Sequence, residues 1–276
     1  MSASARQLAE GLVPAVRSAC EDRLGEITWF RTDWQRGGAA TGESTFRTDH
    51  DTDVPVVIKY PVGEKELRWT RRLQADDAPV IPRLYASGTE IGGYDFAWLI
   101  IEHLPAGPLG MHWDDANVER VADAAARFHK ATSAYPVDRV PVREDWSTLA
   151  KRGSEVLRQN DVPDKSLWKE AMKRFRKHLH TLADAWHEHE PDQWIHGDLH
   201  LANAMCRDDR DDADVVLIDL AEVRAGHWIE DAVYLERQLW ARPERLKATR
   251  PVKAIANARK HHGLTVDAEY TRLAMI

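Results

Sequence analysis

The chain has 276 residues, a length that allows one large domain or two smaller lobes to bury a core without disulfides or a structural metal. Hydrophobic residues make up 43% of the chain and charged residues 30%, which excludes a disordered protein, and the longest apolar runs, such as residues 96–101, are too short to cross a bilayer. The formal net charge of −7 argues against a nucleic-acid partner, because phosphate binding requires a concentrated basic surface.

The first hundred residues are predicted to form a leading helix followed mainly by β-structure. Apolar residues at helical spacing, and then short β-rich runs separated by glycines and polar turns, are the basis of this prediction. The expected elements are, in chain order, an amphipathic helix at residues 5–20, an antiparallel meander of strands near residues 27–30, 44–48 and 54–60, a helix at residues 64–75, and two strands near residues 83–91 and 94–104 joined by a Gly92-Gly93 turn.

The strands stop near residues 103–110, and nearly all of the remaining chain is predicted to be helical. The expected elements are a helix from Asp114 or Asp115 to about Ser133, a helix from about Lys165 to Glu188, an extended loop and a short hairpin within residues 194–220, and at least two helices within residues 228–276. We therefore predict an α+β fold with a small N-terminal lobe, residues 1–102, and a larger, mainly helical C-terminal lobe, residues 103–276.

The strongest functional signal is the run of residues 196–203, HGDLHLAN. Asp198 is followed five residues later by Asn203, on a loop that enters an apolar hairpin, so both side chains can reach the same small volume. Sixteen residues after Asn203, an apolar strand ends in Asp219, which supplies another carboxylate at the mouth of the hairpin. Asn203 and Asp219, completed by water and phosphate oxygens, form a natural ligand set for Mg²⁺. This arrangement leaves Asp198 free to receive a proton.

These residues give the chain a resemblance to the aminoglycoside phosphotransferase and choline kinase family, whose members share the protein-kinase fold. The family pattern HGDxHxxN is met at His196, Gly197, Asp198, His200 and Asn203, and a second pattern, Ile-Asp with later Gly and Asp, at Ile218, Asp219, Gly226 and Asp231. Residues 124–131 are similar to a helix of the family, and Lys59 and Glu66 match its strand lysine and helical glutamate. The resemblance extends over roughly residues 25–240.

The resemblance implies a catalytic role for three of the matched residues. Asp198 would orient the acceptor hydroxyl and take its proton as the phosphoryl group is transferred. Asn203 and Asp219 would hold Mg²⁺ against the phosphates of ATP. His200 has two interpretations, contact with phosphate and simple packing against the loop.

The resemblance also implies a nucleotide site and a support for the catalytic loop. Lys59 would pair with the α- and β-phosphates while Glu66 fixes the lysine. The predicted hinge, whose backbone would contact adenine, consists of Ile101, Glu102, His103 and Leu104. His196 and Asp231 would brace the catalytic loop.

Two features depart from the patterns of related kinases. The loop that covers the phosphates is expected at residues 36–45, but this segment contains no GxGxxG. Leu220 and Ala221 follow Asp219 where protein kinases carry Phe-Gly, and no Ala-Pro-Glu follows. We therefore expect no regulation by phosphorylation of an activation loop.

Together these patterns predict an ATP- and Mg²⁺-dependent kinase that phosphorylates a hydroxyl group of a small molecule. The alternative is a catalytically inactive nucleotide-binding regulatory protein on the same fold. Cys20 and Cys206 lack CxxC spacing, and Glu10 interrupts the apolar start, so we expect a cytoplasmic protein without a membrane partner. The sequence does not define the oligomeric state.

A basic segment, residues 242–260, bears on the acceptor. It carries seven Lys or Arg residues against the single Glu244. Clustered positive charge at the cleft would repel a polyamine, so we predict a neutral or anionic hydroxyl compound, such as a sugar or polyol derivative, in place of a polycationic aminoglycoside. The alternative interpretation is that the basic segment is a solvated helix face.

Overall fold

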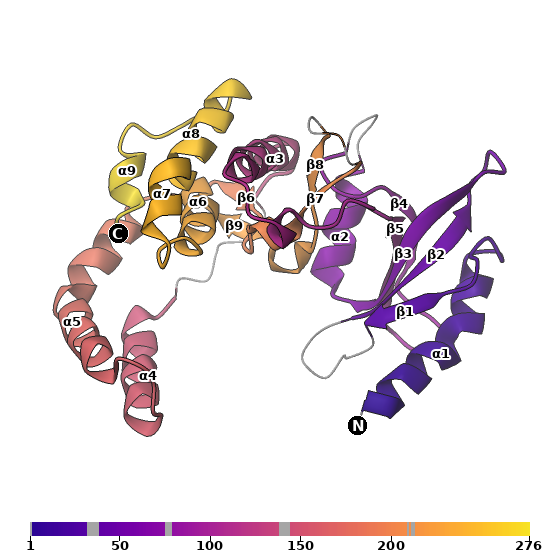
Figure 1. Ribbon diagram of the computed structural model, residues 1–276, viewed down its shortest axis with the longest axis horizontal. Coiled ribbons are helices and arrows are strands. Elements are labelled where there is room, and N and C mark those ends of the chain that lie inside the picture. Colours follow the sequence, from indigo (N-terminus) through magenta and orange to yellow (C-terminus); the bar gives the residue numbers. More distant parts are fainter. Residues whose placement is uncertain (1, 32–38, 75–78, 138–143, 209, 211–212) are drawn as a thin grey trace.

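The computed structural model describes residues 2–31, 39–74, 79–137, 144–208, 210 and 213–276 (Figure 1). Its α-helices are α1 (Ser2–Ala19), α2 (Glu64–Arg72), α3 (Ala116–Thr132), α4 (Trp146–Gln159), α5 (Lys165–His187), α6 (Trp228–Arg237), α7 (Pro243–Thr249), α8 (Pro251–His261) and α9 (Tyr270–Leu273). Its strands are β1 (Thr28–Arg31), β2 (Ala40–Arg47), β3 (Asp53–Val62), β4 (Leu84–Gly88), β5 (Ala97–Glu102), β6 (Gln193–Ile195), β7 (Ala204–Cys206), β8 (Val215–Leu217) and β9 (Arg224–Gly226). Short 3₁₀ turns are η1 (Leu109–Met111), η2 (Leu201–Asn203) and η3 (Leu220–Glu222).

The N-terminal lobe is a five-stranded antiparallel sheet in the order β1-β2-β3-β5-β4. Strands β3 and β5 are central and alternate between two apolar faces. Ile58 and Ile100 face α1, where they pack in one cluster with Leu12. Leu99 faces the opposite side and packs with Leu67 of α2. The sheet is therefore covered by α1 on one face and by α2 on the other.

This alternation determines where the lysine of β3 points. Lys59 follows Ile58 in the strand, so its side chain leaves the sheet on the α2 face. Glu66 lies in the first turn of α2 and is buried. The strand and the helix thus bring the two residues of the predicted nucleotide site to the same side of the sheet.

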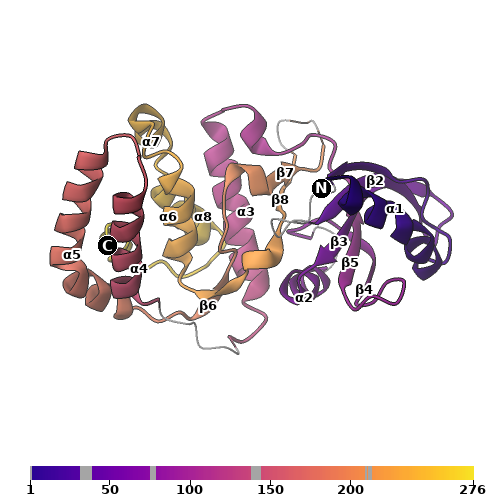
Figure 2. The same ribbon diagram turned by 90° about the horizontal axis from the view of Figure 1, so that it is seen from below.

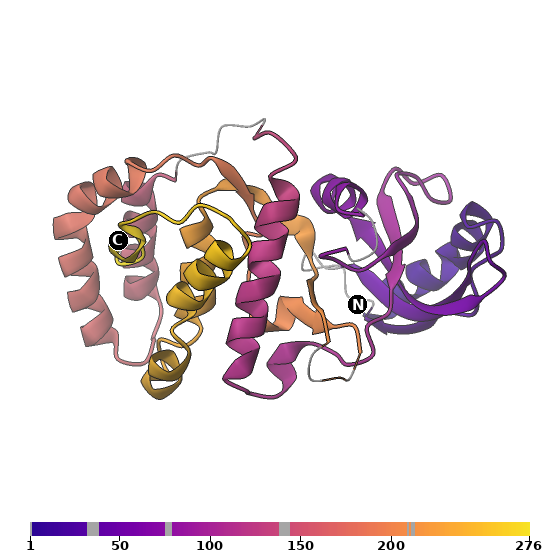
Figure 3. The same ribbon diagram turned by 90° about the horizontal axis from the view of Figure 1, so that it is seen from above.

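The C-terminal lobe is organised around α3, which lies between the sheet and the remaining helices (Figure 3). Its predicted apolar stripe is buried as expected, with Val118, Val121, Ala125 and Phe128 in the large core. That core also contains residues of the β6–β9 strand pair and of the β7–β8 hairpin, and the inner faces of α6 and α8. At the end far from the sheet, α4 and α5 run side by side (Figure 2).

The structure corrects and extends several sequence predictions. Residues 40–45 were expected in a phosphate-covering loop, but Ala40–Arg47 pairs with β3 along its whole length, so this part is strand; residues 36–38 of the same prediction lie outside the described residues. Helix α4 and the β6–β9 pairing were not predicted. None of the described helices is long and apolar enough to span a membrane. The boundary of the lobes at residues 102 and 103 stays a prediction.

Candidate active site

The predicted catalytic loop, residues 196–203, begins at a turn that requires glycine. Strand β6 leads into Gly197, whose φ of +79° lies in the left-handed region. A Cβ atom on this residue would lie 2.3 Å from the carbonyl oxygen of Glu222 in η3. Gly197 therefore lets the loop pass directly against η3, which brings Asp198 close to the segment that carries Asp219.

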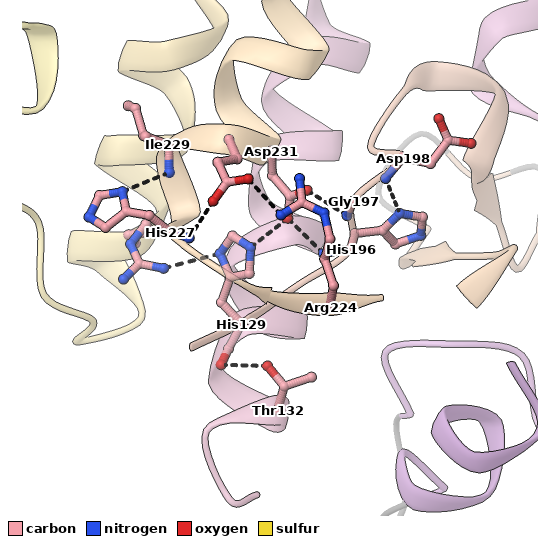
Figure 4. Close-up of polar contacts among 11 residues, drawn as sticks. His129, Thr132, His196, Gly197, Asp198, Arg224, His227, Ile229 and Asp231 are labelled. Atoms are coloured by element: carbon pink, nitrogen blue, oxygen red, sulfur yellow. Dashed lines mark hydrogen bonds and ion pairs between the residues drawn. The ribbon is translucent and has the colours of Figure 1, made fainter. Parts of the chain in front are cut away.

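A buried carboxylate holds this turn from behind. Asp231 of α6 accepts hydrogen bonds from the backbone N–H groups of His196 and Gly197, both at 2.9 Å (Figure 4). It also accepts from Nε2 of His129 in α3, at 2.9 Å. Burial alone would raise the pKa of Asp231, but the hydrogen bonds from His129 and from the backbone N–H of Gly197 act in the opposite direction, and the pKa lies below its usual value. Asp231 thus stays ionised and ties two helices to the catalytic loop.

The network continues to α8 through a buried arginine. Arg259 is only 3% exposed, and its Nη1 donates to Nδ1 of His129 at 3.1 Å. Its Nε and Nη2 donate to the carbonyl oxygen of Thr265. Because Nδ1 of His129 accepts a hydrogen bond from Arg259, the proton of the neutral ring is on Nε2, where it faces Asp231. Sequence patterns missed both His129 and Arg259, although His129 lies within the matched segment 124–131.

Asp198 lies at the tip of the loop and is surrounded by donors. Nδ2 of Asn203 donates to Oδ2 of Asp198 at 2.9 Å and to its carbonyl oxygen at 3.0 Å. The hydroxyl of Tyr234 in α6 donates to Oδ1. Nε2 of His200 is 3.5 Å from Oδ2. Burial alone would raise the pKa of Asp198, but the hydrogen bond from Tyr234, the charge of His200 and the Asn203 hydrogen bond bring it below the usual value.

Tyr234 was not identified from the sequence. It lies one helical turn after Asp231, so both residues face the catalytic loop from α6. The helical periodicity of α6 agrees with this placement, but no sequence motif identifies a tyrosine at position 234. Its hydroxyl donates to Oδ1 of Asp198 while Asn203 donates to Oδ2, and both hydrogen bonds favour the ionised form that a proton acceptor needs.

The two lobes meet at a Lys–Glu–Asp cluster. Nζ of Lys59 is 2.6 Å from Oε1 of Glu66 and 3.5 Å from Oδ1 of Asp219. Burial raises the pKa of Glu66, although Lys59 acts in the opposite direction. The lysine side chain is held by a buried partner on one side and faces the C-terminal lobe on the other. This leaves its charge directed at the space between the lobes.

Asn203 and Asp219 are brought together by backbone contacts. The N–H of Ile218 donates to the carbonyl oxygen of Asn203 at 2.9 Å, and Nε2 of His196 lies 3.0 Å from the carbonyl oxygen of Ile218. Asp219 then turns with a φ of 62°, and its side chain is 47% exposed. Because Asn203 uses its amide nitrogen for Asp198, its amide oxygen remains as a ligand atom.

These two residues fit a Mg²⁺ ion shared with a nucleotide. Magnesium in kinase sites uses one or two carboxylates and completes its octahedron with phosphate and water oxygens. Among the described residues, no group of three or more His, Cys, Asp or Glu side chains could hold a metal ion alone. One carboxylate and one amide oxygen therefore match a site that depends on substrate phosphates.

The predicted hinge spans the end of β5, with Ile101 and Glu102 as the last residues of the strand and His103 and Leu104 after it. Ile101 is paired with Val57 of β3. The N–H of Glu102 donates to the carbonyl oxygen of Arg83 at 2.8 Å, and that of His103 to Pro55 at 3.2 Å. The Glu102 carboxylate forms an ion pair with Arg207. Within the part of the chain that the structure describes, the N–H of Leu104 donates to no backbone carbonyl, so Leu104 is the predicted hinge residue with a free donor.

The buried histidines of this site predict that stability falls in mild acid. Burial lowers the pKa values of His129 and His196 below the usual value. Below about pH 6.5 the unfolded chain binds protons that the folded chain does not, so the free energy of unfolding should decrease by up to about 1.4 kcal/mol per pH unit for each histidine. Asp231 adds nothing in this window, because a lowered carboxylate pKa acts only in stronger acid.

Urea unfolding at pH 7.5 and pH 5.5 measures this slope. The exposed His178 provides the matched control, since His178→Gln should keep the wild-type slope whereas His196→Gln should flatten it. Equal unfolding free energies of the wild-type protein at the two pH values would contradict the prediction.

A small antiparallel sheet with a Lys–Glu pair, joined to a helical lobe that carries Asp198, Asn203 and Asp219, is the architecture of the kinase-like phosphotransferases. The chain belongs to the phosphotransferase enzyme family, since the sequence profile of that family matches residues 28–274. This family is the one that the sequence motifs resemble. No curated protein sequence matches the chain.

Solved structures agree on the fold. Spectinomycin phosphotransferase APH(9)-Ia in complex with ADP and spectinomycin is 12% identical, over 96% of this chain and 86% of that chain, with a TM-score of 0.54. Aminoglycoside phosphotransferase APH(3'')-Id from Streptomyces rimosus in complex with ADP and streptomycin is 19% identical, over 96% of both chains, with a TM-score of 0.51. The predicted two-lobed, protein-kinase-like α+β fold is thereby confirmed.

Proposed function

We propose that this protein is an ATP-dependent kinase that transfers the γ-phosphoryl group to a hydroxyl group of a small molecule. The observation that carries the proposal is the convergence of Lys59 from the sheet with Asp198, Asn203 and Asp219 from the catalytic loop and hairpin. Phosphoryl transfer needs little covalent chemistry from the protein. It depends on positioned charges and on a group that orients the nucleophile.

The side chains suit the transfer step by their charges and contacts. Asp198 is ionised and accepts hydrogen bonds, so it can orient an acceptor hydroxyl and take its proton. The hydroxyl oxygen bonds to the γ-phosphorus as the bond to the β–γ bridging oxygen breaks, and ADP leaves with that oxygen. Lys59 stabilises the negative charge on the phosphates. A Mg²⁺ ion held by Asn203 and Asp219 would neutralise phosphate charge.

The placement of the basic segment bears on the acceptor that the sequence predicted. Arg259 is buried in the network behind the loop, and the guanidinium of Arg245 lies 4.3 Å from the ring centre of Trp113. The other five cations, Arg242, Lys247, Arg250, Lys253 and Lys260, are exposed. None of the seven lines the cavity that Tyr234 borders. The segment matches the alternative interpretation, a solvated helix face, and the choice of acceptor depends on the cavity itself.

Calorimetry and product analysis test the proposed function. We expect titration of Mg·ATP to show binding that weakens strongly when Mg²⁺ is chelated, and phosphorus NMR to show a phosphate monoester when hydroxyl compounds are added. Binding of Mg·ATP with no turnover for any hydroxyl compound would support the inactive regulatory protein. Absence of nucleotide binding at millimolar concentrations would contradict both functions.

A further inference from the structure

A cavity of about 280 Å³ opens beside the candidate catalytic base. It lies between α5, α6 and residues 273–276, with residues 144 and 146 at its edge. Its volume is close to the lower end of small-molecule sites, roughly 300 Å³. The cavity therefore suits a compact ligand and is small for a compound built of several sugar rings.

Tyr234 connects this cavity to Asp198. The tyrosine lines the cavity, and its hydroxyl donates to Oδ1 of Asp198. A ligand hydroxyl that enters along Tyr234 thus arrives at the carboxylate that would take its proton. This contact distinguishes the cavity from surface hollows in other parts of the molecule, such as the one beside Arg120 and Asp123.

The wall opposite α6 is apolar and aromatic. Its main side chains are Trp146, Phe175, Leu179, Leu182 and Trp186. Val233 adds an apolar contact from α6. Such a wall binds apolar ligand surface, because the removal of that surface from water is favourable. It offers few partners for a ring of hydroxyl groups, each of which would lose its bonds to water.

The charged lining does not favour a cation. Glu230 is paired with Arg224, with 2.6 Å between Oε2 and Nη1. The guanidinium carbon of Arg237 lies 3.6 Å from the ring centre of Tyr234, next to the position where an acceptor would meet Asp198. Glu144 is exposed at the edge. A polyamine would therefore meet arginine near the reacting end and would find no cluster of unpaired carboxylates.

We propose that the acceptor is an uncharged alcohol carried on a compact aromatic or alicyclic body, and that this body binds between α5 and α6 in the cavity beside Tyr234. The proposal rests on the kinase function proposed above. It keeps the neutral acceptor that the sequence predicted and replaces the sugar or polyol by an apolar compound, because the wall opposite α6 offers few polar partners.

The wild-type protein tests the chemical class directly. The probes are benzyl alcohol, its 4-aminomethyl derivative, glucose and kanamycin, each supplied with Mg·ATP. We expect kcat/KM for benzyl alcohol to exceed that of the 4-aminomethyl derivative and of glucose by about tenfold or more, since about 1.4 kcal/mol of lost apolar contact or added charge repulsion corresponds to tenfold. Preference for glucose, for the amine or for kanamycin would overturn the proposal.

A matched pair of variants places the alcohol in the cavity. Leu182 lines the cavity from α5, whereas Leu167 of the same helix is 64% exposed. Leu182→Asp should raise the Kd for benzyl alcohol at least about tenfold, and Leu167→Asp should leave it unchanged. Binding of Mg·ATP, measured by calorimetry, should be unchanged in both variants. Unchanged binding shows that each variant is folded. Equal Kd values for the alcohol in the two variants would overturn the proposed position.

Binding separates failure of this inference from failure of the kinase function. Tryptophan fluorescence reports the ligand without chemistry, because Trp146 and Trp186 line the cavity. If Mg·ATP is hydrolysed slowly in an Asp198-dependent manner but benzyl alcohol neither binds nor is phosphorylated, the acceptor class is wrong and the kinase stands. If the alcohol binds but no Asp198-dependent turnover occurs, the kinase function fails while the cavity is correctly described.

Discussion

Asp198→Asn is expected to lower kcat by about 10²- to 10⁴-fold while Mg·ATP binding stays close to that of the wild-type protein. The amide has the shape of the carboxylate but cannot take the proton of the acceptor hydroxyl. Tyr234 can still donate to the remaining oxygen, so the loop should keep its position. Asp198 is not assigned as a metal ligand, and for this reason binding and chemistry should separate.

The measurement is kcat for the best acceptor, with calorimetry of Mg·ATP on the same purified protein. Asp214→Asn is the matched control, because Asp214 is an exposed aspartate just before β8 in the same hairpin. The control should retain wild-type turnover. Near-wild-type turnover in a folded Asp198→Asn protein would remove Asp198 from the role of base.

The positions that sequence could identify are those that a local pattern defines. Asp198 and Asn203 lie on one loop, so their contact follows from a spacing of five residues. The alternation of β3 predicts that Lys59 leaves the sheet opposite to Ile58, and a glutamate in the next helix is within reach. The buried stripe of α3 has the same origin, because helical periodicity places Val118, Val121 and Phe128 on one face.

Contacts between distant segments could not be predicted in this way. Arg259 and Asp231 are joined through His129 across three helices, and no spacing in the sequence encodes that meeting. Tyr234 reaches Asp198 only because α6 packs against the catalytic loop. Each is a polar residue in an apolar helix pattern, and burial of such residues depends on the partners that the fold supplies.

Helix α4 was missed for a different reason. Its apolar residues Leu149 and Val156 are more than 40% exposed, and Ala150 is the residue that it buries. The helix begins where Asp145 caps it, with its Oδ1 accepting from the N–H of Thr148 at 2.9 Å. The sequence carries this cap and apolar residues at helical spacing, whereas the packing partner that stabilises the helix, α5, is supplied by the fold.

The second large effect is expected at Asp219. Asp219→Ala removes the one carboxylate assigned to Mg²⁺, which leaves the amide oxygen of Asn203 as the protein ligand. Turnover that depends on Mg²⁺ should fall by at least about 10²- to 10³-fold, a size typical of losing a charge-stabilising group. Lys59 also loses a contact at 3.5 Å, but its pairing with Glu66 should keep it in place.

Backbone strain must be separated from the loss of the carboxylate. Asp219 has a φ of 62°, a left-handed conformation that asparagine tolerates better than alanine. Asp219→Asn therefore keeps the backbone and one oxygen ligand while it removes the charge, and its Mg²⁺ requirement should lie between those of the wild-type protein and Asp219→Ala. The rate of ADP release, measured at increasing Mg²⁺ concentrations, gives the Mg²⁺ requirement of each protein. Asp214→Ala changes an exposed aspartate and is the control, which should match the wild-type protein. An unchanged rate and an unchanged Mg²⁺ requirement in Asp219→Ala would contradict the assignment, because no other described carboxylate is paired with Lys59 on the side of the C-terminal lobe.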